Sequence, residues 1–137
     1  MLKSVVCLVL LLASAGARSA DGNNLELGRL EYLNSCAVCH GAEGRGQTPM
    51  AEQLKAEPAN LRLLAKRNGG DFPTARVYET IDGRLAVPAH GGREMPVWGQ
   101  RYSSEAGPAH NYHPYRTEAE VRSRILALID YLYTLQD

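Results

Sequence analysis

Apolar residues recur at helical spacing in two stretches of the chain, one toward each end. In the first stretch, Leu27, Leu30 and Leu33 predict a helix that begins near Asn24 and runs to the cysteines. In the second stretch, one apolar stripe comprises Val121, Ile125, Leu128, Ile129 and Leu132. The segment Thr117-Glu118-Ala119-Glu120 before this stripe fits a capping box, so we expect the last helix to begin there.

The middle of the chain predicts two short helices. The first follows Asn60, whose side chain can cap it, and ends at the turn Asn68-Gly69-Gly70. The second has Pro73 in its first turn and ends before Gly83. It places three side chains together, Val77, Tyr78 and Ile81. The segment 85–114 is rich in Gly, Pro and His without sustained periodicity, so we expect a loop there.

These elements predict an all-α fold with long loops, because no stretch alternates apolar and polar residues for the length of a strand. Few aliphatic side chains lie between Gly83 and Thr117, although the loops there need an interior to pack on. A large apolar cofactor would supply that interior.

The first 17 residues have the features of an export signal. A positively charged start is followed by an apolar run from Val5 to Ala13 and by the small residues Ala15-Gly16-Ala17. This pattern predicts cleavage after Ala17 rather than after Ala20. The apolar run is shorter than the roughly 20 residues that span a bilayer. We therefore expect residues 18–137 to form one exported, periplasmic domain without stable membrane insertion.

The charge pattern excludes nucleic acid as a partner. The full chain has 15 Lys and Arg against 15 Asp and Glu, and loss of Lys3 with the signal leaves a net charge of −1. Basic residues outnumber acidic ones only in the segment 59–101. Binding to phosphates needs a dense basic stripe, and the sequence has none.

The residues with the clearest chemistry are Cys36, Cys39 and His40, which form Cys-Ala-Val-Cys-His. Cys7 belongs to the export signal, so Cys36 and Cys39 are the only thiols of the exported chain. On one helical turn, residues three and four apart share a face. The two thiols can then add to the two vinyl groups of one haem while the imidazole reaches the iron.

Two other chemistries fit a pair of cysteines at this spacing. A redox dithiol would need a βαβ setting, and the sequence predicts none. A structural zinc site would need further ligands, for which His110 and His113 are the only paired candidates. The adjacent histidine favours one covalently attached haem c over both alternatives.

The chain resembles the class I c-type cytochromes over nearly the whole exported part. Gly28 and Tyr32 stand eight and four residues before Cys36, where that family has a glycine and an aromatic residue. Leu128 and Tyr131 match the partner pair on the family's last helix, and "REMPVWG" is similar to its sixth-ligand loop. The resemblance implies the cytochrome c fold, in which the first and last helices cross closely beside one haem.

The resemblance also implies ligands. Met95 is the expected second axial ligand opposite His40, with Met50 and His90 as its rivals. The carbonyl of Pro49 matches the family's usual acceptor for the other ring nitrogen of His40.

Two further features accompany the methionine loop. The indole N–H of Trp98 can donate to a haem propionate, or its ring can cover the haem edge. The segment 103–116 is longer than the link that most small cytochromes have before the last helix. We expect a polar surface loop there rather than a metal or partner site.

Two protein ligands leave no open position on an iron, which favours a one-electron carrier over an enzyme. Such a carrier is expected to be a monomer that meets its redox partners transiently. The basic segment 59–101 carries Met95, so we expect weak docking of the Met95 face onto an acidic partner. The alternatives are a haem subunit of a larger oxidoreductase complex, and a haem enzyme or ligand sensor. In that enzyme or sensor Met95 is displaced, and His110 or His113 acts at an open iron.

Overall fold

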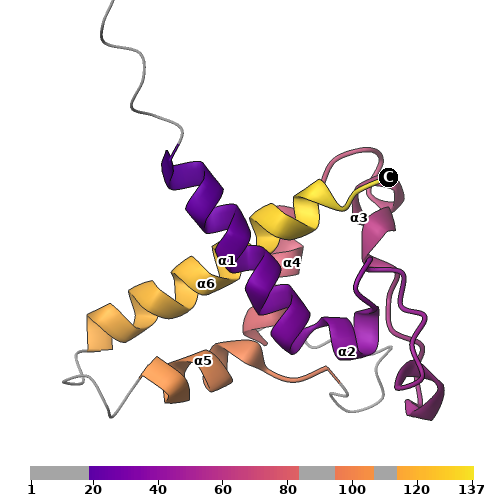
Figure 1. Ribbon diagram of the computed structural model, residues 1–137, viewed down its shortest axis with the longest axis horizontal. Coiled ribbons are helices and arrows are strands. Elements are labelled where there is room, and N and C mark those ends of the chain that lie inside the picture. The colour runs from indigo at the N-terminus through magenta and orange to yellow at the C-terminus, as the bar shows by residue number, and fades with distance from the viewer. Residues whose placement is uncertain (1–18, 84–94, 107–113) are drawn as a thin grey trace, which may run out of the picture.

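The computed structural model of the protein describes residues 19–83, 95–106 and 114–137. These residues form the helices α1 (Ser19–Ser35), α2 (Ala37–His40), α3 (Leu64–Arg67), α4 (Thr74–Asp82), α5 (Trp98–Ala106) and α6 (Pro114–Thr134) (Figure 1). Short 3-10 helices, η1 (Ala51–Gln53) and η2 (Leu61–Leu63), complete the regular structure. The described residues contain no strand, so the all-α prediction is confirmed for them.

Two predictions from the sequence concern the export signal and membrane insertion. The export signal predicted for residues 1–17, with the predicted cleavage site after Ala17, lies outside the described residues. Within the described part of the chain, no helix combines the length and the apolar character that a membrane crossing requires.

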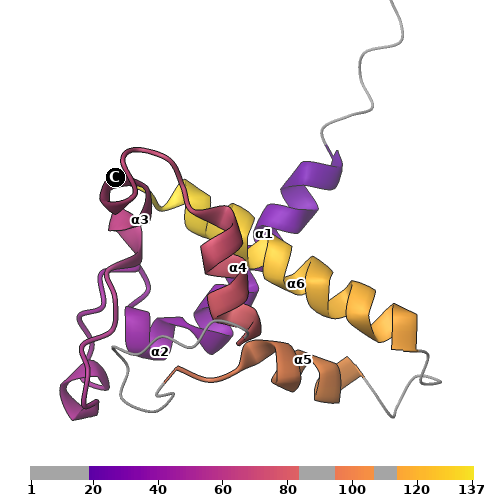
Figure 2. The same cartoon turned by 180° about the vertical axis from the view of Figure 1, so that it is seen from behind.

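The fold is organised by the crossing of α1 and α6, which form an X with α4 and α5 on one side (Figures 1 and 2). At the crossing, Gly28 faces α6 so closely that a β-carbon there would overlap the carbonyl oxygen of Ala127. One turn further along α1, the ring of Tyr32 lies 5.3 Å from that of Tyr131. The close crossing that the sequence predicted through Gly28 and Tyr32 is therefore present.

The helix α1 differs from the prediction in its start and in its buried face. It begins at Ser19 rather than near Asn24. Its buried residues are Gly28, Tyr32 and Ser35, whereas the predicted leucine stripe remains 37–45% exposed. Because the glycine lets the α6 backbone approach, the face that carries Gly28 and Tyr32 packs on α6, and the leucines remain exposed.

The helix α6 starts earlier than the capping box predicted. It begins at Pro114, which places Thr117 inside the first turn. Proline suits the first helical position because its fixed φ is already helical and its missing N–H has no partner to lose there. All five residues of the predicted apolar stripe are buried. Two other large apolar residues of α6 are exposed, Tyr133 by 65% and Leu126 by 38%.

The two short helices in the middle are confirmed. The Asn60 side chain accepts a hydrogen bond from the Arg62 N–H at 3.0 Å, as a cap does, and η2 continues directly into α3. The helix α4 follows Pro73 and ends at Gly83, whose φ of 90° is the left-handed conformation typical of a C-terminal glycine.

The loop predicted for 85–114 is wrong over Trp98–Ala106, which form α5. This helix buries two large side chains, Trp98 and Tyr102, one turn apart on one face. Gly99 faces α4, where a β-carbon would overlap the Asp82 carboxylate. A nine-residue helix with two aromatic anchors has too few apolar positions to show a periodic stripe, and its tertiary contacts decide its conformation.

The core is shared among α1, α4, α5 and α6. The helices α4 and α5 pack on α6 and on each other, while α2 remains beside the end of α1. The buried apolar cluster comprises Tyr32, Val77, Ile81, Trp98, Tyr102, Val121, Ile125, Leu128, Ile129 and Leu132.

The last residues bind the η2–α3 segment. The Gln136 amide donates to the Leu61 carbonyl at 2.9 Å and accepts from the Ala65 N–H at 3.0 Å. Asp137 accepts a hydrogen bond from the Arg62 guanidinium and donates its own N–H to the Arg62 carbonyl. These bonds tie the end of α6 to the chain that follows the Cys-x-x-Cys-His motif.

Candidate haem site

The Cys-x-x-Cys-His motif lies at the junction of α1 and α2. The Cys36 N–H donates to the Tyr32 carbonyl at 2.8 Å, which continues the α1 ladder, and the His40 N–H donates to the Cys36 carbonyl at 2.9 Å. Cys36, Cys39 and His40 therefore share one helical turn, as their spacing predicted. Both thiols are free and partly buried.

The environment of Cys36 is apolar and negatively charged. Burial, and then the neighbouring Glu31 and Cys39, raise the pKa of the Cys36 thiol to about 12. The thiol is therefore protonated at neutral pH, although the thiolate is the nucleophilic form. Cys36 also packs against the buried core cluster.

The loop after His40 holds the motif in place. Gly41, Gly44 and Gly46 all have positive φ, which lets the chain turn back on itself. The Gly46 N–H donates to the His40 carbonyl at 2.7 Å. A β-carbon at Gly46 would overlap the Pro58 carbonyl oxygen, so the glycine allows the 58–59 segment to approach the motif.

That approach gives His40 its hydrogen-bond acceptor. The Nδ1 atom of His40 lies 3.0 Å from the carbonyl oxygen of Ala59. A carbonyl oxygen only accepts, so Nδ1 is the nitrogen that donates its proton in this bond. The sequence predicted the Pro49 carbonyl as the acceptor. This is corrected to Ala59, because the packing of Gly46 on Pro58 brings a later part of the chain to the imidazole.

Tyr32 links this loop to the helix crossing. Its side chain is fully buried, and its hydroxyl donates to the Gly41 carbonyl at 2.6 Å. The residue that packs on α6 thus also fixes the carbonyl directly after His40. Two hydrogen bonds to backbone carbonyls therefore hold the motif and its loop. The Tyr32 hydroxyl bonds the Gly41 carbonyl, and the His40 ring bonds the Ala59 carbonyl.

Met95 and Trp98 lie together at the start of the α5 region. Met95 is half-buried and packs against the same core cluster as Cys36. Trp98 is 6% exposed, and the Arg101 guanidinium lies over its ring at 4.9 Å. The structure therefore brings Met95, Trp98 and Cys36 to one core, although they are far apart in sequence.

The rival ligands are placed differently. Met50 stands at the start of η1 and is 39% exposed. His90, His110 and His113 lie outside the described residues. The polar segment at 103–116 is helical at both ends, in α5 and α6, and its centre is not among the described residues.

A polar cluster that joins α1, α5 and α6 was not predicted from the sequence. Arg124 forms ion pairs with Glu31 at 2.7 Å and with Glu105 at 2.9 Å. Its guanidinium lies 4.0 Å from the centre of the Tyr102 ring. Trp98 and Tyr102 are four residues apart, so they share one face of a helix, and this spacing could have indicated the cluster. The sequence predicted a loop there, so the spacing was not used.

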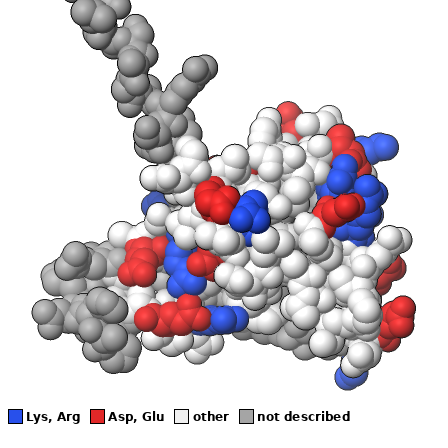
Figure 3. Space-filling view, in the orientation of Figure 1, with Lys and Arg blue, Asp and Glu red and all other residues white. Residues whose placement is uncertain are grey.

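Basic side chains gather beside α3 (Figure 3). Arg45, Arg62 and Lys66 surround Asp137, whose pKa is lowered chiefly by its hydrogen bond with Arg62. Arg67 is also exposed at the end of α3. This α3 cluster contains three of the basic residues that make the segment 59–101 basic, Arg62, Lys66 and Arg67.

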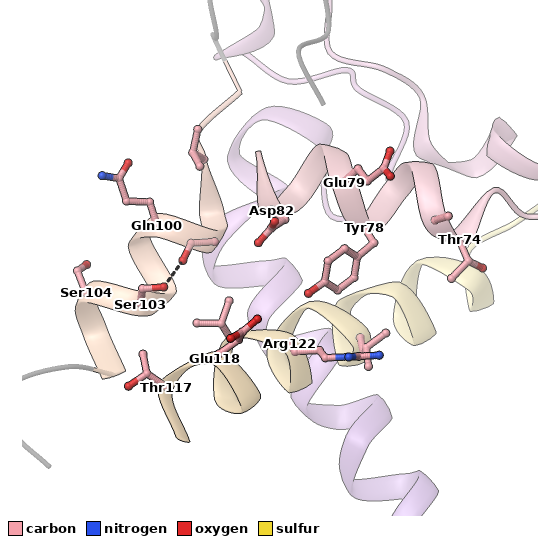
Figure 4. Close-up of a pocket in the computed structure, with 15 residues that line it drawn as sticks. Thr74, Tyr78, Glu79, Asp82, Gln100, Ser103, Ser104, Thr117, Glu118 and Arg122 are labelled. Carbon is pink, nitrogen blue, oxygen red and sulfur yellow. Dashed lines mark hydrogen bonds between the residues drawn. The ribbon is translucent and has the colours of Figure 1, made fainter. Parts of the chain in front are cut away.

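A surface groove lies between α4, α5 and α6 (Figure 4). Its volume is about 1210 Å³, and Tyr78, Glu79, Asp82, Glu118 and Arg122 are among the residues that line it. None of the motif residues and neither Met95 nor Trp98 contributes to it, so the groove is separate from the candidate haem site.

The grouping of possible metal ligands bears on the zinc alternative, and comparisons with known proteins bear on the family. Within residues 19–83, 95–106 and 114–137, no three His, Cys, Asp or Glu side chains come together as a metal-binding group. Comparison of the chain with protein-family models, with curated proteins and with solved structures gives no match.

Proposed function

We propose that this protein is a periplasmic one-electron carrier with one haem c attached through Cys36 and Cys39, in the cytochrome c fold. The observation that carries the proposal is the single helical turn shared by both thiols and His40, with His40 Nδ1 bonded to a backbone carbonyl. That arrangement matches the needs of an axial imidazole, because a hydrogen bond at Nδ1 fixes the tautomer and the orientation of the ring.

The residues fit such a group in three ways. Cys36 and Cys39 supply two free thiols on one turn, and His40 supplies Nε2 as an axial donor. Met95 supplies a thioether from a distant part of the chain that packs on the same core as Cys36. When bound, a haem with these ligands takes up and releases one electron at its iron, and thioether ligation favours the reduced metal.

The proposal of an electron carrier follows from these two axial ligands. His40 and Met95 would occupy both axial positions, which leaves no site for a substrate on the iron. The chain's own role is then to fix two ligands and to exclude water from the core that Cys36 and Met95 share. A haem subunit of a larger complex and a haem enzyme or sensor with Met95 displaced remain as alternatives.

Partner docking is expected to be weak and to depend on charge. The α3 cluster presents exposed Lys66 and Arg67 beside the loop that follows His40, since the Leu61 N–H donates to the Gly44 carbonyl at 2.7 Å. We propose that this surface meets an acidic redox partner transiently. Electron-transfer rates should fall as salt is added, whereas rates that are independent of salt contradict the docking surface.

The test is expression of the full chain in cells that attach haem in the periplasm. We expect a coloured product whose mass includes one haem and whose spectrum is that of a low-spin c-type haem. The double variant Cys36→Ser/Cys39→Ser should be exported without covalent haem. A compact, exported and colourless wild-type protein contradicts the proposal.

Carbon monoxide separates the carrier from the alternatives. A reduced protein with both axial positions filled should bind carbon monoxide poorly at neutral pH, whereas an enzyme or sensor with an open iron should bind it readily. Gel filtration of the native extract separates a free monomer from a subunit that elutes with a larger complex.

A further inference from the structure

The side chain of Gln136 joins the end of α6 to the chain that follows the Cys-x-x-Cys-His motif. Its amide nitrogen donates to the Leu61 carbonyl at 2.9 Å and to the Leu132 carbonyl at 2.7 Å. Its amide oxygen accepts from the Ala65 N–H at 3.0 Å. All three bonds are partly buried. One uncharged side chain thus connects the last turn of α6 to both η2 and α3.

The Leu61 carbonyl lies two residues beyond the carbonyl that accepts from the motif histidine. The His40 Nδ1 atom lies 3.0 Å from the Ala59 oxygen. Between Ala59 and Leu61, Asn60 has extended backbone, and its side chain accepts from the Arg62 N–H. Because this link is short and capped, a displacement of Leu61 is passed to the Ala59 carbonyl.

Leu61 is bonded on both sides. Its N–H donates to the Gly44 carbonyl at 2.7 Å, in the loop after the motif, while its carbonyl accepts from Gln136. The neighbouring ion pair between Arg62 and Asp137 is more exposed to solvent, so we expect it to contribute less. Gln136 is therefore the partly buried side chain that ties this segment to α6.

Resting on the proposed function, we propose that Gln136 is a positioning residue for the axial imidazole, on which it acts through Leu61 and Ala59. A hydrogen bond at Nδ1 fixes the orientation of a ligating imidazole and raises its basicity. A firmly held Ala59 carbonyl keeps that bond short, whereas a carbonyl that can move weakens it. Gln136 thereby sets how strongly His40 donates to the iron.

The experiment compares Gln136→Leu with the wild type as haem-loaded proteins. Leucine is similar in size and uncharged, but it can neither donate to Leu61 nor accept from Ala65. The weaker bond at Nδ1 makes the imidazole less basic, which favours the reduced iron. We expect the equilibrium constant for reduction to rise two- to fivefold, an increase in midpoint potential of about 18–41 mV for one electron.

The Nδ1 proton of His40 gives a second and direct readout. In the reduced protein, its exchange with solvent deuterium, followed by NMR, should be at least fivefold faster in Gln136→Leu than in the wild type. The amide of Ile125, a fully buried residue of the core, reports general opening of the fold. Its exchange rate should rise by a smaller factor than that of the His40 proton.

Thr134→Val is the matched control, because Thr134 lies at the same end of α6 but donates to Tyr131 of its own helix at 2.7 Å. It should change neither the potential nor the exchange of the His40 proton. If Gln136→Leu lowers the melting temperature but leaves the potential unchanged, and the His40 and Ile125 protons exchange faster by equal factors, Gln136 only stabilises the fold and the inference is overturned. If the wild type carries no covalent haem, the proposed function itself fails, which is a distinguishable result.

Discussion

The α-carbon of Gly28 meets the carbonyl of Ala127 at the point where α1 crosses α6, with no room for a β-carbon between them. This contact sets the distance between the helix that leads into the cysteine motif and the helix that supplies much of the core. Any side chain at position 28 must push the two backbones apart.

Gly28→Ala should therefore destabilise the protein by about 1–3 kcal/mol or more, since an added methyl group overpacks a rigid backbone contact. Gly22→Ala is the control within the same helix, because a β-carbon there meets nothing within 4 Å. It should stabilise α1 by roughly 0.5–1 kcal/mol through its better helix propensity. Urea unfolding of both variants measures the two effects, and equal effects of the two substitutions contradict the close crossing.

Met95→Ala tests the proposed second ligand. Loss of the thioether should lower the midpoint potential and open the iron to exogenous ligands, which redox titration and carbon monoxide binding measure. Met50→Ala, at an exposed position directly before η1, should change neither property. If the potential and the spectrum of Met95→Ala equal those of the wild type, Met95 is not the ligand.

Arg124→Met tests the ion pairs that join α1, α5 and α6. The substitution leaves Glu31, whose side chain is only 14% exposed, without its cation. We expect a loss of about 1–3 kcal/mol in the free energy of unfolding, measured with urea, because hydrogen bonds to charged groups contribute at this level. Arg122→Met, on the exposed side of α6, should cost little. Similar losses for both variants argue against a structural role of the pairs.

The Glu105 ion pairs predict a pH dependence. Hydrogen bonds from Arg101, and then from Arg124, hold the pKa of the Glu105 carboxyl below its ordinary value. A group with a lower pKa in the folded state stabilises the protein above its unfolded pKa, and this stabilisation is lost as the pH falls through the folded pKa.

The melting temperature of Glu105→Gln should accordingly lie below that of the wild type at pH 7, and the gap should close below about pH 4. Glu118→Gln, at the exposed start of α6, serves as the control. A gap that stays constant down to acidic pH would show that the carboxylate charge of Glu105 is not involved.

The sequence predicted the parts of the fold that depend on local pattern. The stripe of α6 is buried as expected because five apolar residues at helical spacing have one stable solution. The cap at Asn60 and the end of α4 at Gly83 were predicted equally well, because the first depends on one side chain and the second on one φ angle. The turn that groups Cys36, Cys39 and His40 follows from their spacing alone.

The sequence did not predict the features of the fold and the site that depend on tertiary contacts. The leucines of α1 have helical spacing but remain exposed, because backbone approach at Gly28 selects a different face. The acceptor of His40 is Ala59 because Gly46 lets a remote segment pack beside the motif, which no local pattern reveals. The helix α5 was missed because its two aromatic residues are buried in a core built together with α1, α4 and α6.

The crossing of α1 and α6 has a consequence for the order of events during synthesis. The Asn24 amide donates to Asp130 at 3.4 Å, so this contact joins residues separated by 106 positions. The segment that bears both cysteines therefore leaves the ribosome well before α6 has been made. Until α6 is present, the core on which Cys36 packs is incomplete. Under the proposed function, both sulfur atoms are therefore most accessible to haem attachment during this interval.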